Sequence, residues 1–283
     1  MPSDYEQLRD QSLANLQKYM DSLPEKKGTI LAYWIKDYTR FLSKEAAFDP
    51  SRLIRYKRGS IVKANLGYRI GSEEGGLHYA VIVDTLSSQS ANTVTIVPFT
   101  SVKQHTNLEN LHPSRLYIGD EIYQALQQKT FSEMQNTEKL LVSLRKRIEE
   151  NRQKTEAIHA CLQAQIEGNK QNKPALSMED TKTQLAERRA ITEALSREVN
   201  SLERKVGRCR KMGFEIQKMK HGSIALIGQI TTISKLRIYD PMYPSDTLAN
   251  IRLSADTMDK LDQKLRELFT KSTENCTKPG NNS

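Results

Sequence analysis

The sequence has few residues that could form covalent or metal cross-links. Its three cysteines, Cys161, Cys209 and Cys276, are widely spaced and have neither a C-x-x-C pattern nor neighbouring histidines. Disulfide frameworks and zinc sites show regular spacings of such residues. We therefore expect no disulfide framework, no metal site and no cofactor.

Long apolar runs are also missing. No run approaches the roughly 20 residues that a membrane-spanning helix requires. The beginning, MPSDYEQLRD, lacks the basic and then apolar pattern of a secretion signal. We expect a soluble, cytoplasmic protein that does not act at a membrane.

Glycine is sparse along the chain except in one stretch. Five of the thirteen glycines lie between residues 59 and 76. On either side, residues 60–65 and 78–83 are rich in β-branched and apolar side chains, which is typical of strands. The pattern predicts a strand, a long glycine-rich loop and a second strand. Such a loop can take left-handed turns and approach a ligand closely.

The loop carries polar groups that suit chemistry on a phosphodiester. Arg69 and His78 flank the carboxylates Glu73 and Glu74, and Ser72 adds a hydroxyl. Cleavage of a phosphodiester needs a cation for the phosphoryl oxygens and a group that exchanges a proton. The residues alone leave a second interpretation open, a mobile surface turn with solvated charges.

Residues 4–47 are expected to form two helices. Pro24 and Gly28 separate them, and Pro50 ends the pair. The second helix has a rich apolar face at helical spacing, formed by Leu31, Trp34, Ile35, Tyr38, Phe41 and Leu42. We interpret this aromatic face as a packing surface, against the strand-rich part of the chain or a second subunit.

Residues 121–220 have the pattern of an antiparallel coiled-coil hairpin. Apolar residues recur at spacings of three and four on both sides of the segment EGNKQNKPALS. A turn centred near Lys173 places three pairs opposite each other: Leu144 and Leu202, Ile148 and Val199, and Asn151 and Leu195. Each arm would extend roughly 60 Å.

The formal net charge of +9 lies mostly in the predicted hairpin. Residues 121–220 hold 20 Lys and Arg against 14 Asp and Glu. The cations crowd the base of the returning arm, at Arg204, Lys205, Arg208, Arg210, Lys211, Lys218 and Lys220. They could attract the phosphates of an RNA strand, or they could form a solvated helix face. The charge pattern is compatible with both.

Four sequence blocks occur in a characteristic order: RG-x-IV, GSEEGG before a strand, TVTIVPFTS, and IGQITTISKLRI before a C-terminal helix. In these blocks the chain resembles the MazF/PemK toxins, the ribonuclease half of type II toxin–antitoxin pairs. The resemblance spans residues 56–102 and 223–270. It implies an α+β fold with a small SH3-like β-barrel, split by the coiled-coil hairpin and preceded by the N-terminal helical pair.

The expected domain organisation follows from this resemblance. The last helix should pack on the barrel through Met258, Leu261, Leu265 and Leu268. The domains are an N-terminal helical extension at 1–50, a discontinuous barrel at 51–120 and 221–271, the hairpin at 121–220, and a disordered tail at 272–283. The family also implies a homodimer and a cognate antitoxin protein.

The resemblance implies metal-independent cleavage of single-stranded RNA. In that reaction the ribose 2′-OH attacks its own phosphate, which leaves a 2′,3′-cyclic phosphate and a 5′-OH. Thr100 matches the catalytic Thr of these toxins, and His78 stands where many of them have an Arg. A histidine can exchange protons near neutral pH, whereas an arginine acts as a cation. We therefore assign His78 as general acid or base and Thr100 as hydrogen-bond donor to the phosphate.

Four further positions complete the candidate site. Arg69 could substitute for the missing arginine charge, and Ser72, Glu73 and Gln229 are candidates for substrate contact. Glu74 stands where the family often has Gln, so its negative charge beside a phosphate would oppose RNA binding. Activity could therefore be weak or restricted to particular sequences.

Two alternatives stay open at this point. His78 could be a structural imidazole that is bonded to a loop carbonyl. The whole chain could also be a non-catalytic RNA- or protein-binding module that works through the hairpin. On an active toxin, the hairpin could serve dimerisation, RNA capture or antitoxin recognition.

Overall fold

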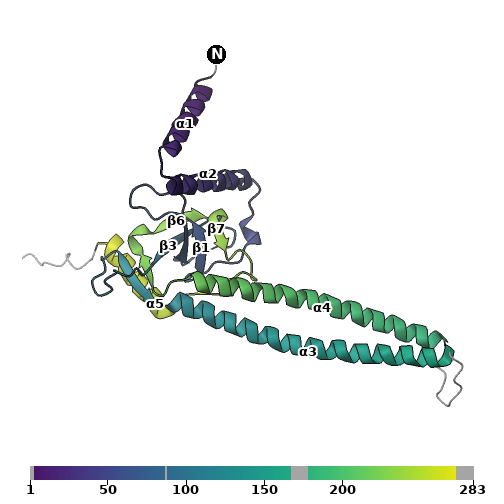
Figure 1. Ribbon diagram of the computed structural model, residues 1–283. Coiled ribbons are helices and arrows are strands. Elements are labelled where there is room, and N and C mark those ends of the chain that lie inside the picture. Colours follow the sequence, from purple (N-terminus) through teal and green to yellow (C-terminus); the bar gives the residue numbers. More distant parts are fainter. Residues whose placement is uncertain (1–2, 87, 167–177, 272–283) are drawn as a thin grey trace, which may run out of the picture. The chain divides into compact units, whose positions relative to one another are not determined.

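The structure, a computed structural model, describes residues 3–86, 88–166 and 178–271. The chain divides into two compact units, Met1–Ala125 with Lys220–Ser283, and Leu126–Met219. The first unit holds a β-sheet with several helices, and the second is a helical hairpin (Figure 1). The predicted α+β class with a long helical insertion is confirmed. The boundaries of the four predicted domains stay a prediction.

The sheet of the first unit is open and antiparallel. Its order is β4-β5-β3-β2-β1-β7, and β6 also pairs with β3. The strands are β1 Ile61–Asn65, β2 Leu77–Ile82, β3 Thr93–Ser101, β4 Arg115–Gly119, β5 Ser223–Leu226, β6 Thr231–Ser234 and β7 Ile238–Asp240. Segments before and after the long insertion therefore share one sheet, as the resemblance implies.

Strand β3 is the centre of this sheet. Along one edge it pairs with β2, where Ala80 lies opposite Pro98 and Ile82 opposite Ile96. Along its other edge it pairs first with β6 and then with β5. The 3-10 helix η2, Ile227–Gln229, separates these two strands. This interruption places Gln229 between two strand segments, at the edge of the sheet.

A buried apolar cluster on one face of the sheet holds the unit together. Val62, Ala80, Ile82 and Ile96 are 0% exposed and contribute to it from three strands. Side chains of alternate residues point to the same face of a strand. His78 therefore lies on the same face as Ala80 and Ile82, at the end of the strand where the apolar cluster stops.

Two N-terminal helices, α1 Asp4–Asp21 and α2 Glu25–Glu45, precede the sheet, and Figure 1 shows α2 lying beside it. Asp37 accepts hydrogen bonds from the Asn65 side-chain amide at 3.1 Å and from the Tyr239 hydroxyl at 2.8 Å. The ring of Phe41 packs edge-on against Tyr239. The aromatic face of α2 therefore packs on the sheet, which is one of the two partners that its spacing predicted.

Short polar contacts fix the points where the chain leaves and rejoins the first unit. Asp120 accepts a hydrogen bond from the backbone N–H of Gly222. Glu121 opens the long helix and accepts from the Ser254 backbone N–H and, at 2.6 Å, from the Thr257 hydroxyl. Ser254 is the N-cap of the last helix, α5 Ala255–Phe269. Glu121 therefore connects the beginning of the insertion with the beginning of α5.

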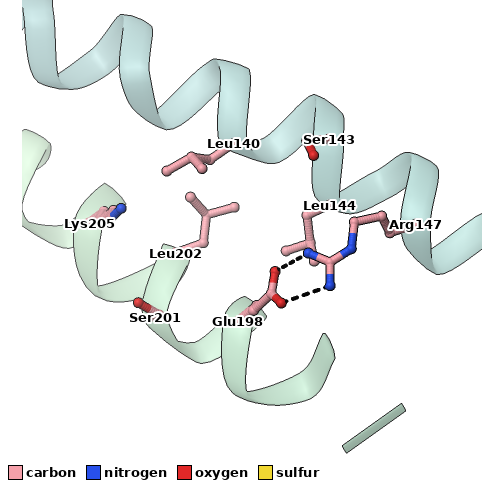
Figure 2. Close-up of a pocket in the computed structure, with 8 residues that line it drawn as sticks. All are labelled: Leu140, Ser143, Leu144, Arg147, Glu198, Ser201, Leu202 and Lys205. Atoms are coloured by element: carbon pink, nitrogen blue, oxygen red, sulfur yellow. Dashed lines mark hydrogen bonds and ion pairs between the residues drawn. The ribbon is translucent and has the colours of Figure 1, made fainter. Parts of the chain in front are cut away.

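The second unit consists of the long helices α3 Glu121–Ile166 and α4 Met178–Lys218, which run antiparallel (Figure 1). Leu144, Leu195 and Leu202 form the buried cluster between them, with Leu141 and Val199 beside it. Arg147 and Glu198 form a bidentate ion pair at 2.5 and 2.9 Å across the seam (Figure 2). The predicted pairing of Leu144 with Leu202 agrees with this cluster.

The predicted seam is wrong at one position. Ile148 is 40% exposed, although its spacing placed it between the helices. At this level the Arg147–Glu198 ion pair, at the side of the seam, links the two helices instead.

Truncation of Leu144 should destabilise the hairpin. Leu144→Ala removes a side chain that is 6% exposed, and we expect it to lower the free energy of unfolding by about 2–4 kcal/mol. Val142→Ala is the matched control, because Val142 is 63% exposed on the same helix. Urea denaturation followed by circular dichroism measures both. Equal losses in the two variants would contradict the packing described here.

Some predictions fall outside the described residues. These are the turn near Lys173, the tail at 272–283 and Cys276. Within the described parts, Cys161 and Cys209 are free thiols. No helix in the described parts is long and apolar enough to span a bilayer.

Candidate active site

The glycine-rich segment forms a loop whose two ends are closed by backbone hydrogen bonds. Leu66 donates to the Gly76 carbonyl at 2.7 Å, and Gly76 donates to the Gly67 carbonyl at 2.7 Å. Gly67 and Gly76 have φ of 90° and 89°, a conformation that residues with a Cβ rarely adopt. The loop between β1 and β2 is therefore held at its base, with residues 68–75 projecting from it.

Gly75 is required for a different reason, which is close packing within the loop. A Cβ atom at this position would lie 2.9 Å from the Gly67 carbonyl oxygen and 2.8 Å from the Cβ of Arg69. Both distances are too short for real Cβ contacts. The carbonyl of Gly75 in turn lies 3.0 Å from Nε2 of His78. The packing of the loop thus positions one contact of the imidazole.

His78 lies in β2 with both ring nitrogens engaged. Nδ1 is 3.0 Å from the Phe99 carbonyl oxygen, and Nε2 is 3.0 Å from the Gly75 carbonyl oxygen. Nε2 is also 3.1 Å from the Glu74 carboxylate. Carbonyl oxygens only accept hydrogen bonds, so both contacts are satisfied together when each ring nitrogen carries a proton. These contacts engage both ring nitrogens with acceptors. They also match the loop-carbonyl contact of the structural alternative.

Thr100 lies in β3, next to the carbonyl that His78 contacts. The last pair of the β2–β3 ladder is Ala80 with Pro98, which lie two residues from His78 and Thr100 along their strands. The contact of His78 with the Phe99 carbonyl brings the ring next to Thr100 in the chain. The Thr100 hydroxyl has no hydrogen-bond partner within the described residues and is half-buried. It is therefore free to donate to a ligand beside the imidazole.

Gln229 reaches the loop from the other half of the sheet. Its side-chain N–H donates to the Ser72 carbonyl at 3.3 Å, and its side-chain oxygen accepts from the Glu74 backbone N–H at 3.3 Å. The amide therefore fastens the loop tip, and Ser72 contributes its backbone to this contact. Of the candidates, the structure brings Gln229, Ser72, Glu74 and His78 into one connected group.

Glu73 and Arg69 lie on opposite sides of this group. Glu73 accepts from the Ile70 backbone N–H at 3.3 Å and lines a pocket of about 310 Å³ together with Glu74 and Gln229. Arg69 lines a separate groove with Glu74 and His78. Among the described residues Arg69 has neither a hydrogen bond nor an ion pair. Arg69 is therefore available as a cation on the imidazole side of the loop.

Arg237 is a functional candidate that the sequence reasoning did not identify. It lines the pocket of Glu73, Glu74 and Gln229, and its Nε donates to the Asn65 carbonyl at 2.7 Å. Its guanidinium stacks over Trp34, and burial lowers its pKa. An anion in the pocket would relieve part of that desolvation cost. The signal was present, because Arg237 is the arginine of the block IGQITTISKLRI.

Comparison with known families adds to this geometry. Residues 57–166 match a family model described as the PemK-like, MazF-like toxin of type II toxin-antitoxin systems. The match covers 110 of the 283 residues of the chain. No curated protein matches the chain.

The toxin-domain match runs continuously from β1 through the first arm of the hairpin. It contains His78, Thr100 and the entire glycine loop, whereas Gln229 and Arg237 lie beyond it. The expected insertion corresponds to the helices that begin with α3, Glu121–Ile166. Within the described parts, His, Cys, Asp and Glu form no cluster that could hold a metal ion.

Proposed function

We propose that this PemK-like protein is an endoribonuclease that cleaves single-stranded RNA without a metal ion. The ribose 2′-oxygen forms a bond to its own phosphorus, and the bond from phosphorus to the 5′-oxygen breaks. The 2′-OH proton passes to a base, and the leaving 5′-oxygen receives a proton. The products are a 2′,3′-cyclic phosphate and a 5′-OH.

The single observation that supports this proposal most is the pair of carbonyls on the His78 ring. They hold the ring through both of its nitrogens, and a positioned imidazole can transfer a proton to a leaving oxygen. We therefore assign His78 as the general acid. The Glu74 carboxylate, 3.1 Å from Nε2, is in reach to accept the 2′-OH proton. Glu74 stands where the toxins often have Gln, and this assignment gives its carboxylate a role as the base.

The developing phosphorane charge needs donors from several directions. Thr100 offers a hydroxyl beside the ring, and Arg69 and Arg237 offer guanidinium groups on the two sides of the loop. Ser72, Glu73 and Gln229 act chiefly by holding the loop, through the contacts described above. Substrate contact by these three residues remains part of the proposal.

Incubation with single-stranded RNA in EDTA tests the proposed function. We expect cyclic-phosphate and 5′-OH ends with the wild type, and their loss in Thr100→Ala, which removes one phosphate donor. Binding of RNA without products would instead favour a non-catalytic module that works through the hairpin. The toxin family also leads us to propose an antitoxin partner, a homodimer and a cytoplasmic location.

A further inference from the structure

A second cavity borders the candidate site on the imidazole side of the loop. It is a groove of about 1020 Å³ in the first unit, between the N-terminal helices and the glycine loop. Its side chains include Leu16 and Tyr19 of α1, Lys27 and Ile30 of α2, and Tyr68 and Arg69 of the loop. His78 and Glu74 also line it. The groove is therefore continuous with the groups proposed to act on the phosphate.

We propose that this groove binds an unpaired nucleotide of single-stranded RNA next to the phosphate that is cut. The inference rests on the proposed function, and it adds a substrate subsite whose wall is the N-terminal helical pair. Pockets for ligands of this size occupy about 300–1,000 Å³. The groove is large enough for such a ligand.

The groove offers surfaces on which a base can stack. Tyr19 of α1 and Tyr68 of the loop both line it. Tyr19 is 51% exposed and Ile70 is 80% exposed, so these apolar surfaces are accessible to a ligand. Aromatic side chains bind bases of single-stranded RNA by stacking, with little dependence on sequence. Helix α1 has no buried residue, which leaves its end free to form this wall.

The charges in the groove fit a phosphate backbone. Lys27 and Arg69 form no ion pair with another described residue. The Glu74 carboxylate lies 3.1 Å from Nε2 of His78, so it already has a partner in the groove. The pocket on the other side of the loop is lined by two carboxylates, Glu73 and also Glu74. A strand with its phosphate at His78 therefore meets more unpaired positive charge when it runs into the groove.

The glycine backbone leaves room for close approach. At Gly71 and Gly76, which line the groove, a Cβ atom would have no neighbour within 4 Å. The space beside these residues is open, and a ligand can approach the backbone there without meeting a side chain. The wall of α1 and α2 opposite the loop then determines how far a base can enter.

Binding of a non-cleavable RNA tests the groove. The probe is a short single-stranded oligonucleotide with 2′-O-methyl groups throughout, measured by fluorescence anisotropy on the full chain. The double variant Tyr19→Ala/Lys27→Ala should bind at least about tenfold more weakly, the loss expected for one stacked base and one phosphate contact. Tyr19→Phe keeps the ring and should bind like the wild type. Lys27→Ala alone should lose less, and that loss should shrink at high salt.

The matched control carries the same two changes outside the groove. Tyr33→Ala/Lys26→Ala alters an exposed tyrosine and an exposed lysine of α2 and should keep the wild-type affinity. Circular dichroism checks that both double variants keep their helix content. Equal affinity of the wild type and the groove variant would overturn the inference. The groove would then be a site for a protein segment. An equal loss in the control would overturn it as well.

The outcomes separate this inference from the proposed function. If the wild type cuts ordinary RNA and the groove variant binds the probe normally, the ribonuclease stands and the subsite is wrong. If the groove variant loses the probe while the wild type makes no products from ordinary RNA, the subsite stands and the ribonuclease is wrong. Absence of probe binding by the wild type overturns the subsite.

Discussion

His78→Ala should lower the rate of RNA cleavage by about 10²–10⁴-fold, because removal of a general acid costs that much. The ring lies 3.0 Å from two carbonyl oxygens and 3.1 Å from the Glu74 carboxylate, so its loss also removes the partner of Glu74. Single-turnover cleavage of a labelled RNA gives the rate directly. His105→Ala is the matched control, since His105 is exposed outside the site.

His78→Arg separates a proton-transfer role from a purely electrostatic role. Arginine keeps the positive charge, as in many MazF/PemK toxins, but it does not release a proton near neutral pH. We expect RNA affinity close to that of the wild type and a cleavage rate that remains low. A wild-type rate in His78→Arg would show that the side chain acts only as a cation. A wild-type rate in His78→Ala would reduce the imidazole to a structural contact.

Gly75→Ala should lower the cleavage rate by about 10²-fold while the sheet stays folded. The new Cβ would lie 2.9 Å from the Gly67 carbonyl oxygen, so the loop must move. That shift displaces the Gly75 carbonyl from Nε2 of His78, and a misplacement near 1 Å can cost about 10²-fold in rate. Cleavage assays and thermal unfolding measure the two effects.

A second glycine gives the control for this substitution. Gly207 lies in α4, where a Cβ atom would meet nothing within 4 Å. Gly207→Ala should therefore keep the cleavage rate and should stabilise the helix by about 0.5–1 kcal/mol. An unchanged rate in Gly75→Ala would mean that the packing of the loop does not position the imidazole.

The local patterns of the sequence predicted much of the fold. The alternation around the glycine loop predicted β1 and β2, and the helical spacings predicted α1, α2 and the hairpin arms. The short strands β4 and β7 were missed as separate elements, because their residues gain a strand conformation only from partners far away in the chain. Strand pairing depends on such non-local contacts more than helix formation does.

The residues of the candidate site were also predicted only in part from local patterns. His78 and Thr100 could be selected from the sequence, since each belongs to a recognisable block. Their neighbouring placement depends on the β2–β3 register, which no local pattern specifies. Arg237 and the clamping role of Gln229 were missed. Their contacts, with Asn65 and Ser72, join residues that are about 150 or more positions apart in the sequence. The groove was missed because helices and loop form it together.

One chemical substitution in the RNA tests the central claim most directly. A single 2′-O-methyl group is placed on the nucleotide whose phosphate the wild type cuts, and the reaction is run in EDTA. The account predicts cleavage of the unmodified strand to a 2′,3′-cyclic phosphate and no cleavage at the modified position. Continued cleavage at the methylated nucleotide would contradict attack by the 2′-OH, and with it the proposed mechanism.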